Sequence, residues 1–267
     1  MTDKIKHILI SSLADLCKIG KNKSTHPLNG HYELTNDIDA SKSRDLDNGR
    51  GFMPIGWCEP DELNKLDQAG FEYWRYGFTG VFDGNNHTIE NLYINRPNGI
   101  GPVGMFGLAT GAEIKNVNIS GNFTGNTSTD GIAGQLSQKG KIINCSFSGE
   151  ISGKESVGGL IGFGSNITIT KSHVSGAVRG TVYVGGLLGC CTKSKIDNCY
   201  LSASVNGSNI LGILAGDCDR SKLNSCYSTA NANISSNVSG LIGRCDSNEI
   251  NNCYWDSQKN NFTNMPS

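Results

Sequence analysis

The chain lacks the features that mark a nucleic-acid-binding or a membrane-spanning protein. Its 267 residues carry a formal net charge of -1, so no electrostatic case for nucleic acid or an anionic membrane follows. No apolar run approaches the roughly 20 residues of a membrane helix, and we expect no membrane insertion. Polar residues interrupt the apolar stretch near the N-terminus, which does not resemble a signal peptide.

Proline, with 6 residues, and aromatic residues, at 7%, are also scarce, whereas glycine, with 35 residues, is abundant. Abundant glycine without proline indicates many turns and close backbone contacts rather than a disordered tract. Six tetrapeptides (GMFG, GIAG, GLIG, GLLG, ILAG and GLIG) recur along the chain. They end 27 or 28 residues apart, at Gly107, Gly134, Gly162, Gly189, Gly216 and Gly243.

A second motif repeats in phase with these glycines and has apolar residues at fixed positions. One such column holds Ile114, Ile142, Ile169, Ile196, Leu223 and Ile250. A coil that cannot bury its apolar face alone can do so by stacking on identical neighbours. We therefore predict an all-β fold, a right-handed parallel β-helix (β-solenoid) with coils of about 27 residues. Each coil has room for two or three strands and their corners.

Seven of the ten cysteines fall into two columns of this repeat. One column holds Cys145, Cys199, Cys226 and Cys253, and the other holds Cys191, Cys218 and Cys245. Small apolar thiols suit a narrow interior, so we interpret them as reduced packing residues. Disulfides and metal binding stay open as alternatives, although no zinc-type spacing is present and we expect neither a metal nor a cofactor. The preceding column, with Asn116, Asn144, Asn198 and Asn252, predicts an asparagine ladder at a corner.

The repeats GGLIG and GGLLG resemble the GLUG motif, named for Gly-Leu-bulky-Gly. The upstream segments ISSLADLCKIG, LNGHYELTNDIDAS and FTGVFDGNNHTIENLYI are similar to the usual lead-in of GLUG-motif proteins, so the resemblance covers roughly residues 9–255. The resemblance implies a solenoid stalk or binding surface of the kind found in bacterial adhesin-like surface proteins, and no catalytic mechanism. It slightly favours an extracellular location.

The whole chain, 1–267, is predicted to be one domain. Apolar residues at helical spacing predict an N-terminal capping helix over residues 1–21, which would cover the open end of the solenoid. Residues 22–101 then form irregular first coils with an insertion at 45–78. Six GLUG repeats occupy 102–255, and 256–267 form a tail.

The insertion is the strongest candidate for a binding site. It concentrates aromatic residues in a chain that has few of them. Loops that project from a rigid scaffold often carry function, and aromatic rings beside charged groups can stack on sugars or anchor a protein. The alternative is that these rings only cover the flank of the solenoid. The candidate residues are Trp57, Phe71, Tyr73, Trp74 and Tyr76.

A search for catalytic residues finds only weak candidates. Asp217, Asp219 and Asp246 are the acidic residues best placed for a glycosidase-like pair, but neighbouring arginines could simply pair with them. His173 shares its column with tyrosines, which indicates an exposed residue rather than a base. No known catalytic signature occurs.

The sequence thus favours a non-catalytic, adhesin-like module that recognises a glycan or a protein. Two alternatives remain, an intracellular phage or pathogen protein that blocks a host factor and a carbohydrate-active β-helix enzyme. The oligomeric state is not predicted.

Overall fold

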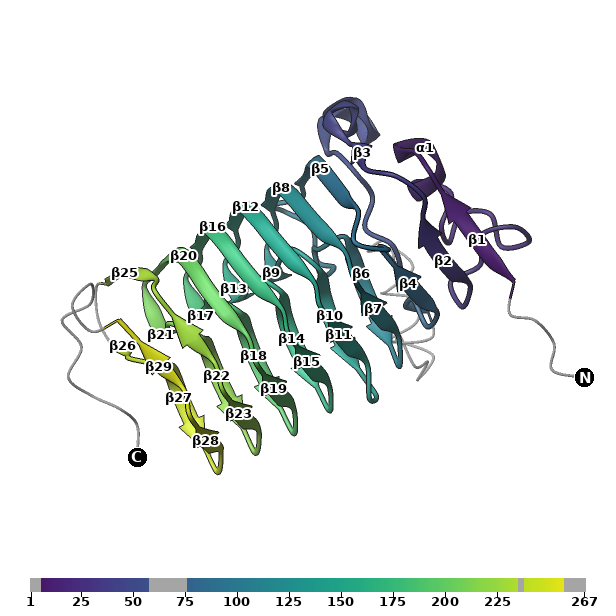
Figure 1. The fold of residues 1–267 in the computed structure, drawn as a ribbon. Coiled ribbons are helices and arrows are strands. Elements are labelled where there is room, and N and C mark those ends of the chain that lie inside the picture. The colour runs from purple at the N-terminus through teal and green to yellow at the C-terminus, as the bar shows by residue number, and fades with distance from the viewer. Residues whose placement is uncertain (1–5, 58–75, 235–237, 257–267) are drawn as a thin grey trace, which may run out of the picture.

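The computed structural model describes residues 6–57, 76–234 and 238–256, which form a parallel β-solenoid of about eight turns. Successive coils stack along one axis, as Figure 1 shows. Each complete coil contributes one strand to each of four parallel sheets, not the two or three strands expected. The additional strand is only three or four residues long. It lies in the turn-rich sequence before each terminal glycine, so the sequence pattern did not predict it.

Sheets 1 and 2 carry the repeated apolar columns. Sheet 1 consists of β1 (His7–Ile10), β2 (His31–Leu34), β4 (Val81–Asp83), β7 (Glu113–Lys115), β11 (Lys141–Ile143), β15 (Thr168–Thr170), β19 (Lys195–Asp197), β23 (Lys222–Asn224) and β28 (Glu249–Asn251). Sheet 2 consists of β3 (Ile38–Asp39), β5 (Thr88–Asn95), β8 (Asn118–Thr124), β12 (Ser146–Ser152), β16 (His173–Arg179), β20 (Tyr200–Gly207), β24 (Tyr227–Ser228) and β29 (Tyr254–Trp255), with β25 (Asn231–Ile234) also paired to β20.

Sheets 3 and 4 complete each coil. Sheet 3 consists of β9 (Thr127–Thr129), β13 (Glu155–Val157), β17 (Val182–Gly185), β21 (Asn209–Gly212) and β26 (Val238–Ser239). Sheet 4 consists of β6 (Phe106–Thr110), β10 (Ala133–Ser137), β14 (Ile161–Ser165), β18 (Leu188–Thr192), β22 (Ala215–Asp219) and β27 (Ile242–Asp246). Two short 3-10 helices, η1 (Ser41–Asp45) and η2 (Asp47–Gly49), lie between β3 and β4.

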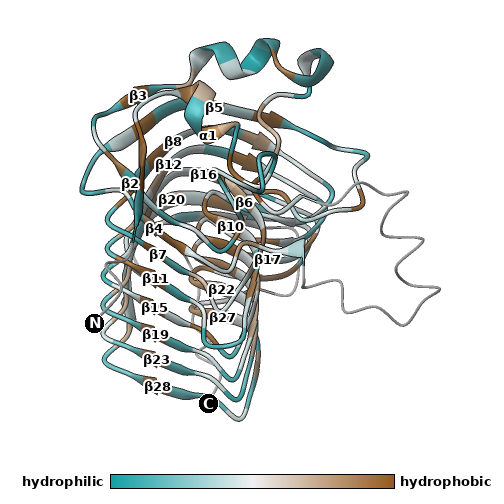
Figure 2. Ribbon diagram, turned by 90° about the vertical axis from the view of Figure 1, so that its right-hand side faces the viewer, coloured by the Kyte–Doolittle hydropathy of each residue, from teal (hydrophilic) through white to brown (hydrophobic). Residues whose placement is uncertain are grey.

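The predicted apolar columns are confirmed as interior ladders. Ile142 pairs in register with Ile114 on one side and Ile169 on the other, and all three side chains are fully buried. Figure 2 shows the strands of sheet 1 stacked in a single column from β4 to β28. Because equivalent residues lie directly above one another, one continuous core runs through the stack.

The predicted N-terminal capping helix is wrong. Residues His7–Ile10 form β1, which extends sheet 1 by pairing with β2, and only α1 (Leu13–Leu16) is helical. Ser12 separates the two, because its hydroxyl accepts the Asp15 backbone N–H at 3.2 Å as a helix N-cap. The run His7–Ile10 also fits the alternation of a strand, and β2 offers it an open edge of backbone donors and acceptors.

Residues in the left-handed backbone region turn the chain at the corners of each coil. Asn116, Asn144, Asn198 and Asn252 have φ between 51° and 53°, at the corner between sheets 1 and 2. Asparagine adopts this backbone region more readily than most residues. The Asn144 side-chain amide donates to Asn116 Oδ1 at 2.9 Å, so the predicted asparagine ladder is present between these two coils. Lys171 and Ser225 hold the corner positions on either side of Asn198 and interrupt it there.

The terminal glycines of the repeat allow sheet 3 to lie directly against sheet 4. A Cβ on Gly189 would lie 2.6 Å from the backbone nitrogen of Val157, in the preceding coil. A Cβ on Gly216 would lie 2.6 Å from the backbone nitrogen of Val184. Because these neighbours are backbone atoms fixed in a sheet, no side chain fits there. The repeat therefore needs glycine for close packing.

The two cysteine columns differ. Cys145, Cys199, Cys226 and Cys253 are buried free thiols, and each donates to the backbone carbonyl two residues earlier at 3.4 Å. Burial raises the pKa of Cys145 to about 12. In the other column Cys191 and Cys218 form a disulfide, with Cα atoms 4.8 Å apart, while Cys245 is free. The interpretation as reduced packing residues holds for the first column, and the disulfide alternative holds for one pair in the second.

Candidate functional site

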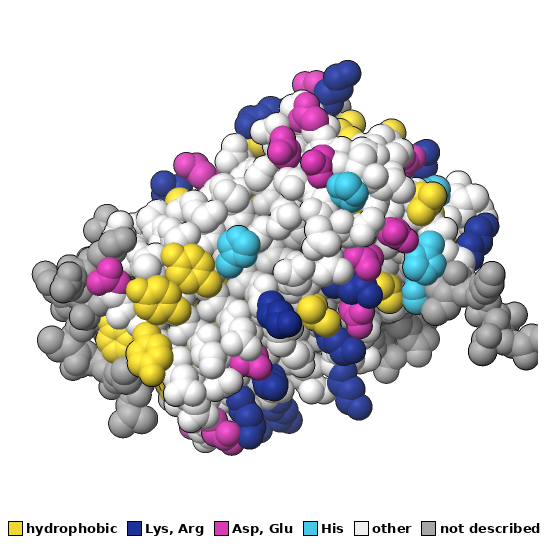
Figure 3. Space-filling view, viewed as in Figure 1, with side chains coloured by type: hydrophobic (Ala, Val, Ile, Leu, Met, Phe, Trp, Pro, Cys, Tyr) yellow, Lys and Arg dark blue, Asp and Glu magenta, His cyan; other side chains and the backbone are white. Residues whose placement is uncertain are grey.

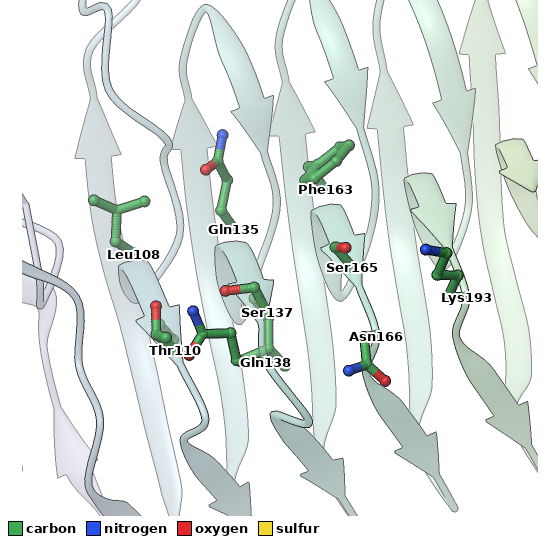
Figure 4. A pocket seen from close by; sticks show the side chains of 11 residues that line it. Leu108, Thr110, Gln135, Ser137, Gln138, Phe163, Ser165, Asn166 and Lys193 are labelled. Atoms are coloured by element: carbon green, nitrogen blue, oxygen red, sulfur yellow. The ribbon is translucent and has the colours of Figure 1, made fainter. Parts of the chain in front are cut away.

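A trough on the outer face of sheet 4 is the larger of the two hollows that stand out on the described surface, with a volume of about 470 Å³. It runs across four successive coils, and three rows of side chains line it (Figure 4). One wall is formed by Leu108, Gln135 and Phe163. The opposite wall is formed by the corner residues Gln138, Asn166 and Lys193.

Small hydroxyl residues form the floor of the trough. Thr110, Ser137 and Ser165 are paired in register on β6, β10 and β14. These floor residues lie three positions after the terminal glycines, and the residues of the first wall lie one position after the same glycines. Because the two positions are two residues apart on a strand, both rows project from the same face. Equivalent positions repeat at the strand spacing of about 4.8 Å. The trough therefore offers similar polar groups at regular intervals.

The walls supply one exposed aromatic ring and one cation. Phe163 is 38% exposed, although it is a large hydrophobic residue in the middle of a sheet. Lys193 is exposed and makes no ion pair with any described carboxylate. No acidic side chain is among the described residues that line the trough.

The predicted insertion, residues 45–78, pairs with β6 beside this trough through Ile55 and Phe78. Phe71, Tyr73 and Trp74 lie outside the described residues. Tyr76 is exposed, and Phe78 pairs with β6, where its backbone N–H donates to the Leu108 carbonyl oxygen at 2.8 Å. At the other end Trp57 is half-buried under the guanidinium of Arg96. The anchors of the insertion thus lie at the N-terminal end of the trough.

The three candidate catalytic aspartates lie on the same face, on β22 and β27. Arg244 pairs with Asp217, and Arg220 donates to Asp219 at 2.8 Å through its Nε. The Arg220 hydrogen bond lowers the pKa of Asp219. A glycosidase acid needs the opposite, a raised pKa that keeps the carboxyl protonated. Asp217 and Asp219 are therefore surface carboxylates that pair with arginines.

An exposed aromatic column also lies on sheet 2. His173, Tyr200, Tyr227 and Tyr254 are register partners, and all four are exposed, as expected for His173. The rings of Tyr200 and Tyr227 stack with centroids 5.9 Å apart. Figure 3 shows large hydrophobic side chains gathered on this face.

Asp130 is a buried carboxyl at the junction of sheets 3 and 4. Its Oδ2 accepts the Gly162 backbone N–H at 2.9 Å, and its Oδ1 has no hydrogen-bond partner in the described part of the chain. Burial raises the pKa of this carboxyl well above its usual range, despite the backbone hydrogen bonds that lower it. The charged form is therefore unfavourable in the folded protein.

Asp130→Asn should raise the melting temperature at pH 8 more than at pH 4. Because the folded pKa lies above the unfolded value of about 3.9, the carboxyl stabilises the fold below that pH and loses this contribution as the pH rises through the folded pKa. Asparagine keeps an oxygen for Gly162 and does not titrate. Thermal denaturation across this range measures the effect, with the exposed Asp45→Asn as control. A difference that does not grow with pH would contradict it.

No described group of three or more His, Cys, Asp or Glu side chains could hold a metal ion. None of the helices in the described ranges is long and apolar enough to span a membrane.

Comparison with known proteins identifies the fold of this chain but not its family. No family model matches the chain. It is 38% identical over 157 residues to halomucin of Haloquadratum walsbyi, which covers 57% of this chain and 2% of that protein. The chain thus spans a small fraction of the length of this relative.

Two solved structures share the solenoid. One is a candidate immunoglobulin A1 protease from Bacteroides ovatus, with a TM-score of 0.69, 20% identity, and coverage of 94% of this chain and 75% of that one. The other is described as an IgA1 protease, with a TM-score of 0.65, 16% identity, and coverage of 94% and 20%. At these identities the likeness shows the fold alone, a parallel β-solenoid.

Proposed function

We propose that this chain is a non-catalytic binding module at a cell surface, and that an extended glycan binds in the sheet 4 trough. The similarity to halomucin, a protein named as a mucin, supports the surface location. In this proposal the repeats are GLUG motifs wound into a right-handed coil, the hand of nearly all parallel crossovers. The trough itself carries the functional part of the proposal.

The composition of the trough fits a glycan better than a peptide. An extended peptide commonly binds by adding a strand to an exposed sheet edge. The strands β10 and β14 are already paired on both sides, so they offer no backbone edge. Hydroxyls and amides on the outer face can instead hydrogen-bond sugar hydroxyls, and Phe163 can pack against the apolar face of a sugar ring.

The regular spacing also favours a chain-like ligand. Three successive coils repeat the floor hydroxyl at about 4.8 Å, so successive sugar units can meet a similar floor. Lys193 adds a positive charge at the C-terminal end of the trough, which suits a glycan with an acidic substituent there. The single observation that carries the proposal is this three-row trough with an exposed phenyl ring on one wall.

A glycan array with the intact chain identifies the ligand, and Phe163→Ala tests the site. Loss of the phenyl ring should weaken binding of the best array hit about tenfold, roughly 1.4 kcal/mol. Calorimetry measures the affinity. The matched control is Tyr227→Ala, which removes an exposed ring from sheet 2 and should leave the affinity unchanged.

Three results would contradict the proposal. Equal affinities of wild type and Phe163→Ala would exclude the trough as the site. Binding to no glycan, with capture of a purified protein instead, would favour the intracellular blocking alternative. Turnover of a polysaccharide that is lost in Asp219→Asn would favour the enzyme alternative.

A further inference from the structure

A second hollow of about 350 Å³ lies where β5 ends, and Trp57 at one end of the insertion is among the residues that line it. It is lined mainly by Arg50, Trp57, Asn95, Arg96 and Asn98. A volume of this size lies within the range of small-ligand pockets and accommodates a single sugar ring. The residues are polar or aromatic, and two of them are arginines.

The pocket holds more positive than negative charge. The Arg96 side chain is only 2% exposed, and its Nη2 donates to Asp47 Oδ2 at 2.5 Å. Arg50, half-exposed, donates to the other oxygen of the same carboxylate at 2.7 Å. The two guanidiniums thus share one carboxylate, which leaves one net positive charge among these three described side chains. Because Arg50 is half-exposed, a second anion can reach this excess charge from the pocket.

Two buried donors beside the pocket have no hydrogen-bond partner among the described residues. They are the Arg96 Nε and the Trp57 Nε1, and both are enclosed. The Arg96 guanidinium lies over the Trp57 ring, 5.1 Å from its centroid. Buried polar groups are nearly always satisfied in folded proteins, so unpaired donors next to a positively charged hollow indicate a missing acceptor.

We propose that this pocket binds the carboxylate of an acidic sugar residue, such as a uronic acid. The guanidinium of Arg50 is accessible and presents the fork of N–H donors that recognises a carboxylate. The amides of Asn95 and Asn98 line the remainder of the pocket and can pair with sugar hydroxyls. This inference does not rest on the trough, because the two hollows share no lining residue.

Calorimetric titration of the full chain with glucuronate, and with glucose as the uncharged counterpart, tests the proposal. Glucuronate should bind and glucose should bind at least tenfold more weakly, because only the acid pairs with the excess charge. The affinity for glucuronate should also fall as the salt concentration rises.

A charge series at the pocket gives the sharper test. Arg50→Gln leaves a neutral Arg96–Asp47 pair and should weaken glucuronate binding about tenfold. Asp47→Asn raises the net charge and should strengthen it, and asparagine suits the left-handed backbone at that position (φ 52°). The matched control is Arg220→Gln, which removes an exposed, ion-paired guanidinium from sheet 4 and should change nothing.

Three outcomes would overturn the proposal. These are no glucuronate binding by folded wild type, equal binding of glucuronate and glucose, or equal affinities of wild type and Arg50→Gln. Stronger binding of a carboxylate-bearing peptide than of glucuronate would reassign the pocket to a protein ligand. Circular dichroism of each variant separates loss of the site from loss of the fold.

Discussion

Gly189→Val should abolish folding of the solenoid. Any Cβ at this position would lie 2.6 Å from the backbone nitrogen of Val157 and 2.6 Å from the carbonyl oxygen of Gly162. Both atoms belong to hydrogen-bonded strands, so sheets 3 and 4 would have to separate along several coils. We expect a loss of about 4 kcal/mol or more, among the largest effects of a single substitution. Circular dichroism and thermal denaturation measure it.

Gly111→Asn is the matched control for this prediction. Gly111 follows β6, has φ 62°, and a Cβ there would only touch the Gln138 carbonyl oxygen at 3.5 Å. The equivalent corner position holds Asn166, with φ 54°. Asparagine should therefore be tolerated at Gly111 within about 0.5 kcal/mol. A Gly189→Val variant that melts like wild type would mean that sheets 3 and 4 do not pack as described.

Phe147→Ala should destabilise the fold by about 3–5 kcal/mol, the usual cost of removing a buried phenyl ring. Phe147 is fully buried on β12, and its ring lies 5.2 Å from that of Phe123. It also fills the space above Gly131, the first glycine of a GIAG tetrapeptide. The cavity cannot close, because the coils on both sides fix the spacing of the backbone. Chemical denaturation measures the loss.

Ser148→Ala provides the comparison within the same strand. Ser148 is the next residue of β12 and points outward, so its replacement should change the free energy of unfolding by less than about 0.5 kcal/mol. Similar losses for the two variants would show that Phe147 does not lie in the interior ladder.

The sequence predicted the repeat well because a solenoid imposes the same surroundings on every coil. Ile142 and Ile169 had to be apolar for the same reason, so the column was visible without a structure. Asn144 was recognised at its corner because few residues adopt its left-handed backbone.

The N-terminal segment was mispredicted because two periods fit the same residues. Ile8, Leu13 and Leu16 recur at helical spacing, yet residues 7–10 also alternate as a strand. The open edge of β2 decided the outcome, and a single-sequence pattern does not contain that edge. The sequence also left the disulfide undecided, because one column of thiols allows several pairings. The structure joins Cys191 to Cys218.

The trough was missed because its residues share no chemistry that a motif search recognises. Gln135, Phe163 and Lys193 are ordinary surface residues until the coils are stacked and the corners placed. A usable signal was nevertheless present. The positions one and three beyond each terminal glycine alternate with the buried ones, so the outward rows could have been read from the repeat. The acidic candidates Asp217 and Asp219 lie in these same rows.

The most direct test of the proposed function is a crystal structure of the intact chain with the oligosaccharide selected on the array. We expect the sugar to lie along the trough, with one ring against Phe163 and hydroxyls within hydrogen-bond distance of Gln138 and Asn166. A sugar bound elsewhere on the solenoid, with the trough empty, would contradict the account.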